Sequence, residues 1–297
     1  MTRPWIAVGI DGSETAREAM LWAAEEASRR RVALVIAHAG DVTSGEVPDE
    51  YGTELLREAE ASVFESDATC PVTARISEEN PVRFLTELSH DADLMVVGSH
   101  GLGRAASSVV GSVAFRVASH ATCPVAVIPR GWQPPPDPRA PVVLGVSATT
   151  AGRTPMYFAF AQARSLGVPL LAVRAWSRLD WTGDLSDLMY RTSSSFETSQ
   201  YDYLERVLKP VRAAFPDVQV QTLVCGGRVE EVLRHESAHR RLLVLGSRFT
   251  DGHTYSRLGP LTSRLLHAAQ CPVVVVGHRT PARVETSEAS SEVSSHA

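Results

Sequence analysis

The chain is short of several features that would place it in a familiar class. No stretch approaches the roughly 18 to 20 consecutive apolar residues that span a bilayer, and the residues from Met1 to Trp5 lead straight into a strand pattern rather than a signal peptide. Lys209 is the single lysine among 29 basic residues, and the net charge is -5. Such a charge gives no bulk attraction to nucleic acid or to anionic membranes. We therefore expect a cytoplasmic protein that binds neither.

Metal and redox signatures are scarce as well. The chain has four cysteines and no CxxC pair, which argues against zinc ribbons and dithiol redox motifs. Cys123 and Cys271 each precede Pro-Val at the start of an apolar run, a setting typical of small core residues. His235 and His239 are one helical turn apart, but two imidazoles alone do not make a metal site. We expect reduced, buried thiols and no metal centre.

Three catalytic motifs are missing. A Walker loop requires Gly-Lys-[Ser/Thr], and no lysine lies near either glycine-rich stretch. The Gly-x-Ser-x-Gly elbow and a dinucleotide fingerprint after the first strand are also absent. These absences count against a P-loop NTPase, a hydrolase of that type and a dinucleotide oxidoreductase.

The chain does contain an internal duplication, in which one sequence unit occurs twice. Residues 6–10 match 142–146 at an offset of 136, and residues 94–99 match 242–247 at an offset of 148. The second copy therefore carries 12 extra residues, which we place in the polar stretch from Trp181 to Ser194. A period of this length indicates duplicated domains rather than a solenoid.

The 297 residues suit two domains, each large enough to bury a core. We expect a first domain over 1–130, a proline-rich linker over 131–140 and a second domain over 141–281. The prolines of the linker cannot join a helix or a central strand. Residues 282–297 are rich in Ser and Glu with little to bury, which predicts a disordered tail.

Within each copy, short β-branched runs alternate with longer segments of helical period, a pattern typical of an α/β fold with a parallel sheet covered on both faces. The first helix is expected to begin after Ser13, with Thr15 and Glu18 at capping-box spacing. Its inward face is predicted to carry Ala16, Ala19, Met20, Ala23 and Ala27.

A glycine cluster follows the apolar run that ends at Val97. Glycines at 98, 101 and 103 let backbone amides close on an anion, and Gly111-Ser112 then opens a helix whose positive end favours negative charge. If the first and fourth strands are neighbours, Asp11 faces this loop, where its carboxylate can accept from a ribose or help hold a divalent ion. The alternative is a tight turn with close helix packing and no ligand.

These residues resemble the universal stress protein family in its tandem form. The family's nucleotide-binding members show G-x2-G-x9-G-[ST], which Gly98, Gly101, Gly111 and Ser112 satisfy, and the likeness runs from Trp5 to about Arg279. The resemblance implies ATP binding and two tandem open parallel five-stranded sheets of order 3-2-1-4-5. It implies that Gly9, Ile10 and Asp11 flank adenine and ribose, that Ala39 touches the base, and that the loop lines the phosphates. The candidate binding residues are Gly9, Ile10, Asp11, Ala39, Val97, Gly98, Ser99, His100, Gly101, Leu102, Gly103, Arg104, Gly111, Ser112 and Val113, with Gly145, Gly246, Gly252 and Gly259 in the second copy.

The second copy departs from that pattern at three positions. Asp11 is replaced by Ser147, Gly101 by Phe249 and Ser112 by Pro260. Phenylalanine does not readily adopt the backbone that glycine permits, and proline removes an amide and a hydroxyl. We expect the second site to be weak, altered in ligand or empty.

The sequence thus predicts an ATP-binding regulator of the stress response. Mg²⁺ or Mn²⁺ can bind together with the nucleotide. No residue is evidently poised to activate water, so any hydrolysis is expected to be slow. A competing hypothesis is a dimerisation or partner scaffold with degenerate sites. The closing strands at 126–128 and 273–276 lie at expected sheet edges and can pair either two copies or two chains.

Overall fold

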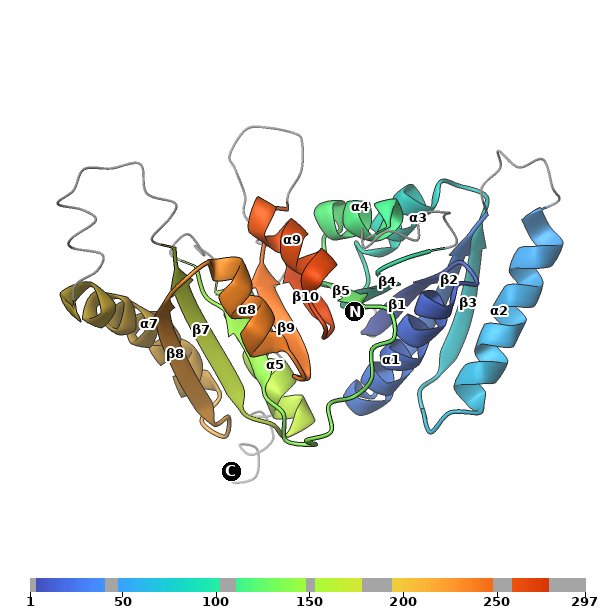
Figure 1. Cartoon of the computed structure of the whole chain (residues 1–297). Helices are drawn as coiled ribbons and strands as arrows, with labels where there is room; N and C mark the ends of the chain where they lie inside the picture. The colour runs from blue at the N-terminus through green and yellow to red at the C-terminus, as the bar shows by residue number, and fades with distance from the viewer. Residues whose placement is uncertain are drawn as a thin grey trace, which may run out of the picture.

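The computed structural model describes residues 4–40, 48–101, 111–147, 153–177, 194–247 and 258–277. They form a single sheet of ten strands in the order β3-β2-β1-β4-β5-β10-β9-β6-β7-β8, with helices packed on both faces (Figure 1). The predicted α/β class is confirmed. We call β1 to β5 with their helices the first copy, and β6 to β10 with theirs the second copy.

The elements of the first copy alternate strand and helix along the chain. They are β1 (Trp5–Ile10), α1 (Glu14–Arg30), β2 (Ala33–Ala39), α2 (Pro48–Phe64), β3 (Val72–Ser77), α3 (Pro81–Leu88), β4 (Leu94–Gly98), α4 (Ser112–His120) and β5 (Val125–Ile128). The second copy repeats the series. Its elements are β6 (Val142–Gly145), α5 (Thr154–Leu166), β7 (Leu170–Trp176), α7 (Ser194–Ala214), β8 (Val220–Gly226), α8 (Val229–Ser237), β9 (Leu242–Gly246), α9 (Pro260–Ala268) and β10 (Val273–Val276).

Helix α1 begins where the sequence predicted, but through a different cap. The Ser13 side chain is the N-cap and accepts from the amide of Ala16 at 3.2 Å. Thr15 instead donates its hydroxyl to the carbonyl of His100, so the expected capping box at Thr15 and Glu18 is wrong. The physical reason is that Ser13 sits in extended backbone just before the first turn, where a short side chain reaches the free amides.

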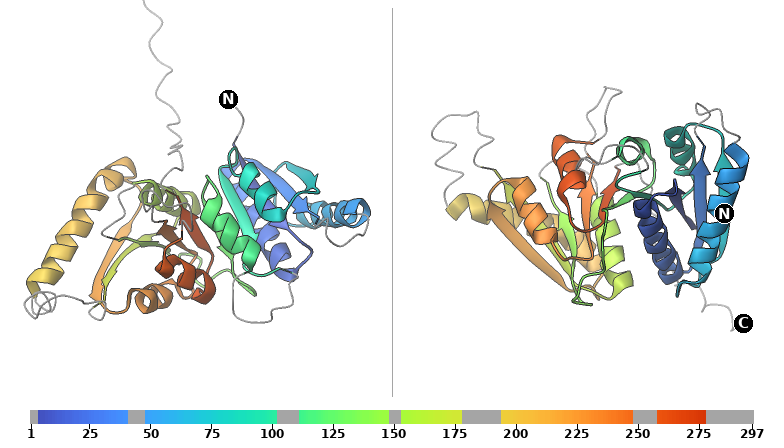
Figure 2. Two further views of the ribbon diagram at one scale, coloured as in Figure 1. Left: turned by 90° about the horizontal axis from the view of Figure 1, so that it is seen from above. Right: turned by 45° about the vertical axis from the view of Figure 1, so that its right-hand side comes forward.

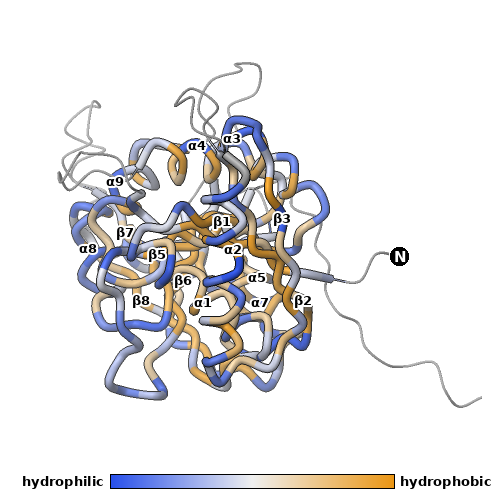
Figure 3. Tube along the Cα trace, turned by 90° about the vertical axis from the view of Figure 1, so that its right-hand side faces the viewer, coloured by the Kyte–Doolittle hydropathy of each residue, from blue (hydrophilic) through white to orange (hydrophobic). Residues whose placement is uncertain are grey.

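Two apolar layers hold the sheet between its helices. One face packs against α1, α2, α5 and α7, and the other against α3, α4, α8 and α9. Both layers run through both copies without a break. Figure 3 shows the apolar strands in the interior and the polar segments at the outside. The predicted inward residues of α1, from Ala16 to Ala27, are buried.

The two copies meet edge to edge. β5 pairs with β10 in antiparallel fashion, with Ala126 opposite Val274, whereas the other strand pairs are parallel. Two separate sheets were expected, and this pairing joins them into one. The cause is that β5 and β10 are short, fully apolar edges whose amides and carbonyls need partners away from water. The pairing that the sequence left open is thus within one chain.

Helices also meet across this junction, as α4 and α9 do on one face of the sheet (Figures 1 and 2). On the other face, the Arg29 guanidinium of α1 donates to the Ser165 hydroxyl of α5 at 2.5 Å. Burial, together with the nearby Arg30 cation, lowers the pKa of Arg29 to about 10.

The segment between the copies is fastened to the first copy at its start. The amide of Gly131, whose φ is 69°, donates to both carboxylate oxygens of Glu18 at 3.0 and 3.1 Å. Trp132 packs against the core, and Pro135 and Ala140 are buried.

No helix of the described residues is long and apolar enough to cross a membrane. The expected tail and the extra loop from Trp181 lie outside the described residues.

Candidate functional site

The site lies where the strand order of the first copy reverses. β1 pairs with β2 on one side and β4 on the other, all in parallel, so their carboxyl ends open on the same edge. The helices α1 and α2 cover one face and α3 and α4 the other. Open parallel sheets bind ligands at such a reversal, and we call this edge, between the ends of β1 and β4, the crevice. Of the predicted residues, Gly9, Ile10 and Val97 lie at these strand ends. The topology therefore brings Asp11, Ala39 and Gly98 to one edge.

Asp11 reaches across this crevice to the glycine loop. Its Oδ1 accepts from the amide of Ser13 at 3.0 Å. Its Oδ2 lies directly against Gly101, in the space that a Cβ at position 101 would occupy. Any side chain at 101 would therefore collide with the carboxylate. The approach of these two residues is what the strand neighbours predicted.

The packing of the loop against α1 requires a glycine at position 98, whether or not a ligand binds. A Cβ there would stand 2.8 Å from the carbonyl carbon and oxygen of Thr15, which are backbone atoms at the start of α1. Two hydroxyls tie the same helix start to the loop, because Thr15 and Ser13 both donate to the carbonyl of His100, the latter at 3.4 Å. The loop is thus clamped onto the amino-terminal end of α1.

Gly111 is different, because the residues that the structure describes leave room beside it. Its amide donates to the carbonyl of Ser99 at 2.7 Å, and the nearest atoms to an added Cβ lie at 3.6 Å, which is ordinary contact. As the N-cap of α4, it offers no side-chain acceptor to the first-turn amides. Such amides are suited to an anion. Ser112 is exposed and Val113 half-buried on this turn.

The remaining loop residues are partly described. Ser99 is buried, and its hydroxyl bonds to Nδ1 of His100 at 2.9 Å. Burial, with a smaller contribution from His100, lowers the pKa of His267 on α9. Leu102, Gly103 and Arg104 lie outside the described residues, as does Gly252 in the second copy.

The opposite end of the crevice is lined by β2 and α2. His38 is buried, and its Nδ1 donates to the carbonyl of Ile10 at 2.9 Å. Ala39 is half-buried beside it. Tyr51 of α2 lies edge-on to the His38 ring, with centroids 6.2 Å apart and planes at 71°. Sequence reasoning missed Tyr51, because nothing in a helical repeat shows which turn faces a distant strand end.

In the second copy the corresponding strand end carries a larger, charged side chain. Arg174 stands where the first copy has His38, and its guanidinium donates to Gln200 at 2.8 Å and to the carbonyl of Val146 at 3.4 Å. The same guanidinium lies over the ring of Tyr203, 4.4 Å from its centroid. Burial lowers the pKa of Arg174.

Trp176 ends the same strand, β7. It is buried and packs edge-on against Phe196, with centroids 5.4 Å apart. The predicted frame residues Gly145 and Gly246 end their strands, and Gly259 caps α9 ahead of Pro260. Phe249 lies outside the described residues.

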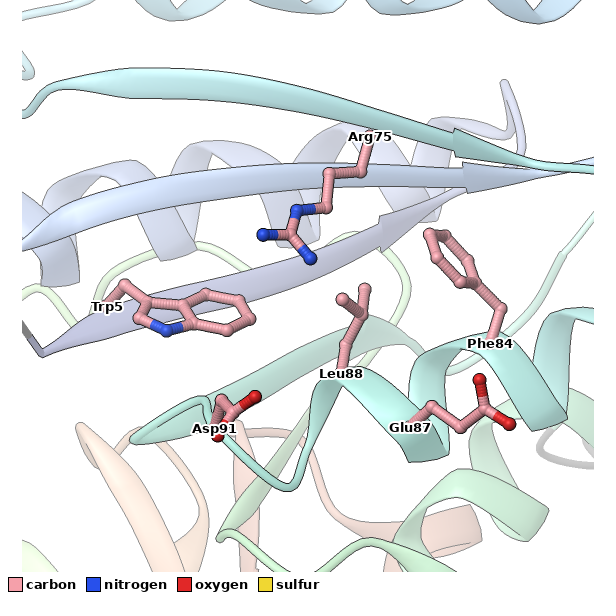
Figure 4. A pocket seen from close by; sticks show the side chains of 6 residues that line it. All are labelled: Trp5, Arg75, Phe84, Glu87, Leu88 and Asp91. Carbon is pink, nitrogen blue, oxygen red and sulfur yellow. The ribbon is translucent and has the colours of Figure 1, made fainter. Parts of the chain in front are cut away.

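A separate hollow of about 340 Å³ lies under α3, at the amino end of β1 rather than at the glycine loop. Figure 4 shows the Arg75 guanidinium reaching toward Trp5, 5.8 Å from its ring centroid, with Leu88 and Phe84 of α3 opposite. This hollow and the crevice are distinct places on the first copy.

The cysteines are not part of the crevice. Cys123 and Cys271 are buried, and burial raises the pKa of each thiol to about 12. The expectation of buried thiols holds for these two and is wrong for Cys70 and Cys225, which are only half-buried. Among the described residues, no group of three or more His, Cys, Asp or Glu side chains is placed to hold a metal ion.

The model of the universal stress protein family matches residues 5–129 and again residues 139–277. The chain belongs to the universal stress protein family. It is 32% identical over 286 residues to universal stress protein Rv2005c of Mycobacterium tuberculosis, covering 91% of this chain and 96% of that one. It is 30% identical over 289 residues to universal stress protein Rv2623 of the same organism, covering 91% and 95%.

Among solved structures, this universal stress protein is similar to one from Archaeoglobus fulgidus. The TM-score is 0.66 at 16% identity, over 92% of this chain and 96% of the other. A likeness at that identity shows the fold, so the tandem arrangement of the two copies is shared over nearly the whole length of both chains.

Proposed function

We propose that this universal stress protein binds ATP in its first copy and acts as a regulator in the stress response. The observation that carries the proposal is the approach of the Asp11 carboxylate to Gly101. A nucleotide needs an acceptor for its ribose hydroxyls beside a bare backbone for its phosphates. The crevice brings the two together, and the resemblance in the Gly98 to Ser112 motif supports the same ligand.

Different residues of the site bind different parts of the nucleotide. Asp11 accepts from the ribose, the backbone of Gly98, Ser99, His100 and Gly101 lies along the phosphates, and the start of α4 at Gly111 and Ser112 receives their terminal charge. The space beside Gly111 suits this role, since an added Cβ there makes only ordinary contacts with the described part of the chain. Mg²⁺ or Mn²⁺ bound with the ATP would neutralise part of the phosphate charge.

We infer binding and signalling rather than rapid turnover. Asp11 has one carboxylate oxygen held by the Ser13 amide and the other against Gly101, a position that suits holding a ribose more than activating water. A steady-state phosphate-release assay with Mg²⁺ or Mn²⁺ tests this. Many turnovers per site would replace the regulator with an enzyme.

We further propose that the second copy holds no ATP, or holds it weakly. Ser147 takes the place of Asp11, and Arg174 and Trp176 stand at the end of β7 where the first copy has His38 and Gly40. The two copies would then have different tasks, with ligand binding in the first and a structural or partner-binding role in the second.

Mass spectrometry of the purified chain tests the function directly. The native protein is compared with Gly111→Ala, which the fold accommodates, and with Gly101→Phe, which copies the second half. ATP retained by the native chain and lost from both variants supports the proposal. Ser147→Ala is the matched control in the second copy and should retain ATP. A native chain without nucleotide, and without calorimetric binding of added ATP, favours the scaffold alternative.

A further inference from the structure

An exposed aromatic side chain stands at the base end of the crevice. Among the described residues, four large hydrophobic side chains are exposed. Two of them lie near each other: Tyr51 on α2, 59% exposed, and Ile76 on β3, 42% exposed. Gly52 links them, since a Cβ there would meet both the Ile76 side chain, at 2.6 Å, and the His38 ring, at 2.9 Å. Clustered exposed apolar groups beside polar strand ends are typical of a binding surface.

The Tyr51 ring spans the part of the crevice next to Asp11. Its hydroxyl lies where a Cβ on Gly12 would be 2.7 Å away, and its ring meets His38 edge-on. Gly12 has a φ of 84°, a backbone conformation that glycine adopts without strain. The absence of a side chain at 12 therefore lets Tyr51 lie across the backbone that leads from Asp11 to Ser13.

In the second copy, a tyrosine ring near the end of the first strand is covered by another side chain of the protein. Tyr203 of α7 donates to the carbonyl of Ser147 at 3.4 Å, so it too reaches the end of the first strand of its copy. There the Arg174 guanidinium covers the ring face at 4.4 Å. In the first copy the residue at the equivalent position of β2 is His38, which meets Tyr51 edge-on and leaves the phenol largely exposed.

We propose that Tyr51 is the side chain of the first copy that recognises the base, by lying against the planar ring of the bound nucleotide. This inference rests on the proposed function and adds a specificity residue to the same site. Aromatic rings stack on bases with little regard to base identity, so Tyr51 distinguishes a nucleotide from a bare polyphosphate. The phosphate end, by contrast, does not depend on Tyr51.

Isothermal titration of the full-length chain with ATP and with tripolyphosphate separates the two ends. Tyr51→Ala is expected to weaken ATP binding by about tenfold or more, which is roughly 1.4 kcal/mol, and to leave tripolyphosphate binding unchanged. Tyr51→Phe keeps the ring and should bind ATP like the native chain. Tyr201→Ala removes an exposed tyrosine of the second copy and is the matched control, with no effect on either ligand. Thermal melts check that each variant is folded.

Three results would overturn the inference. If the native chain binds ATP and Tyr51→Ala binds it equally well, Tyr51 has no part in recognition while the proposed function stands. If Tyr51→Ala weakens ATP and tripolyphosphate alike, the ring supports the loop rather than the base. If the native chain binds neither ligand, the proposed function fails first and the inference falls with it.

Discussion

The carboxylate of Glu26 on α1 accepts a hydrogen bond at 2.9 Å from the side-chain amide of Gln162 on α5. The two residues occupy the same position in the two copies, 136 residues apart, so equivalent side chains meet across the junction. Both are buried, at 2% and 3% exposed. Two identical copies would bring two carboxylates together here. The amide at 162 removes that conflict and complements Glu26, which also pairs with Arg29 and Arg30.

The first prediction concerns this pair. Gln162→Glu places a second buried carboxyl against Glu26 and is expected to lower the free energy of unfolding by about 1 to 3 kcal/mol, measured by urea denaturation near neutral pH. The loss should shrink in acid, because the new carboxyl at 162 can then be protonated and donate to Glu26. Gln219→Glu, at an exposed position, should cost little. Equal effects of the two substitutions would contradict the prediction.

Gly98 and Gly111 should respond differently to replacement by alanine. Gly98→Ala forces a methyl to within 2.8 Å of the Thr15 backbone, so β4 or α1 must shift, and we expect a loss of roughly 1 to 3 kcal/mol of stability. Gly111→Ala meets only ordinary contacts within the described ranges and should leave the free energy of unfolding within about 0.5 kcal/mol of the native value. Chemical denaturation of both variants in the absence of nucleotide provides the comparison, and a destabilised Gly111→Ala would refute the assignment of free space.

Asp11 and Ser147 form a matched pair in the two copies. Asp11→Ala removes the proposed ribose acceptor, and losing a hydrogen bond to a charged group, worth about 1.5 to 3 kcal/mol, should weaken ATP binding by roughly tenfold or more. Ser147→Ala should leave the affinity unchanged. Titration calorimetry reports both affinities. A larger effect at 147 would move the principal site to the second copy.

Because of the two buried thiols, the free energy of unfolding should fall at alkaline pH. Burial raises the pKa of Cys123 and of Cys271 from an ordinary 9.0 to about 12. The unfolded chain therefore releases these protons near pH 9 while the folded chain keeps them. The resulting stabilisation is complete below pH 9 and is lost as the pH rises toward 12.

The slope of stability against pH is the measurement. The double variant Cys123→Ala and Cys271→Ala is expected to start from a lower stability, because alanine leaves a small cavity, but to decline less steeply between pH 9 and 12. Cys70→Ala, at a half-buried position, serves as the control. Parallel curves for the double variant and the native chain would show that the two thiols do not contribute.

The features that local sequence predicted are those with a local cause. The alternation of strand and helix follows from the hydrophobic period, and the start of α1 after Ser13 follows from a short polar side chain ahead of a segment with apolar residues at helical spacing. The meeting of Asp11 and the glycine loop followed from a single further condition, that β1 and β4 are neighbours, which the structure satisfies.

The features that were missed depend on contacts between distant segments. An apolar strand such as β5 does not reveal whether its partner is β10 or another chain, because the same run satisfies either pairing. Tyr51 and Arg174 were missed for a related reason, since the partners of each side chain lie on another strand or helix, and the local pattern does not show how those elements pack. Thr15 was misassigned as a cap because its true partner, His100, is 85 residues away.

The antiparallel bonding of β5 to β10 makes the association of the two copies a unimolecular property. A connector of about ten residues keeps tethered partners at an effective concentration near millimolar, so dilution or a change in expression level cannot separate them. Each molecule therefore carries the two unlike copies in a fixed ratio. The response to nucleotide that we propose should accordingly depend on the supply of nucleotide and not on how much of the protein a cell contains.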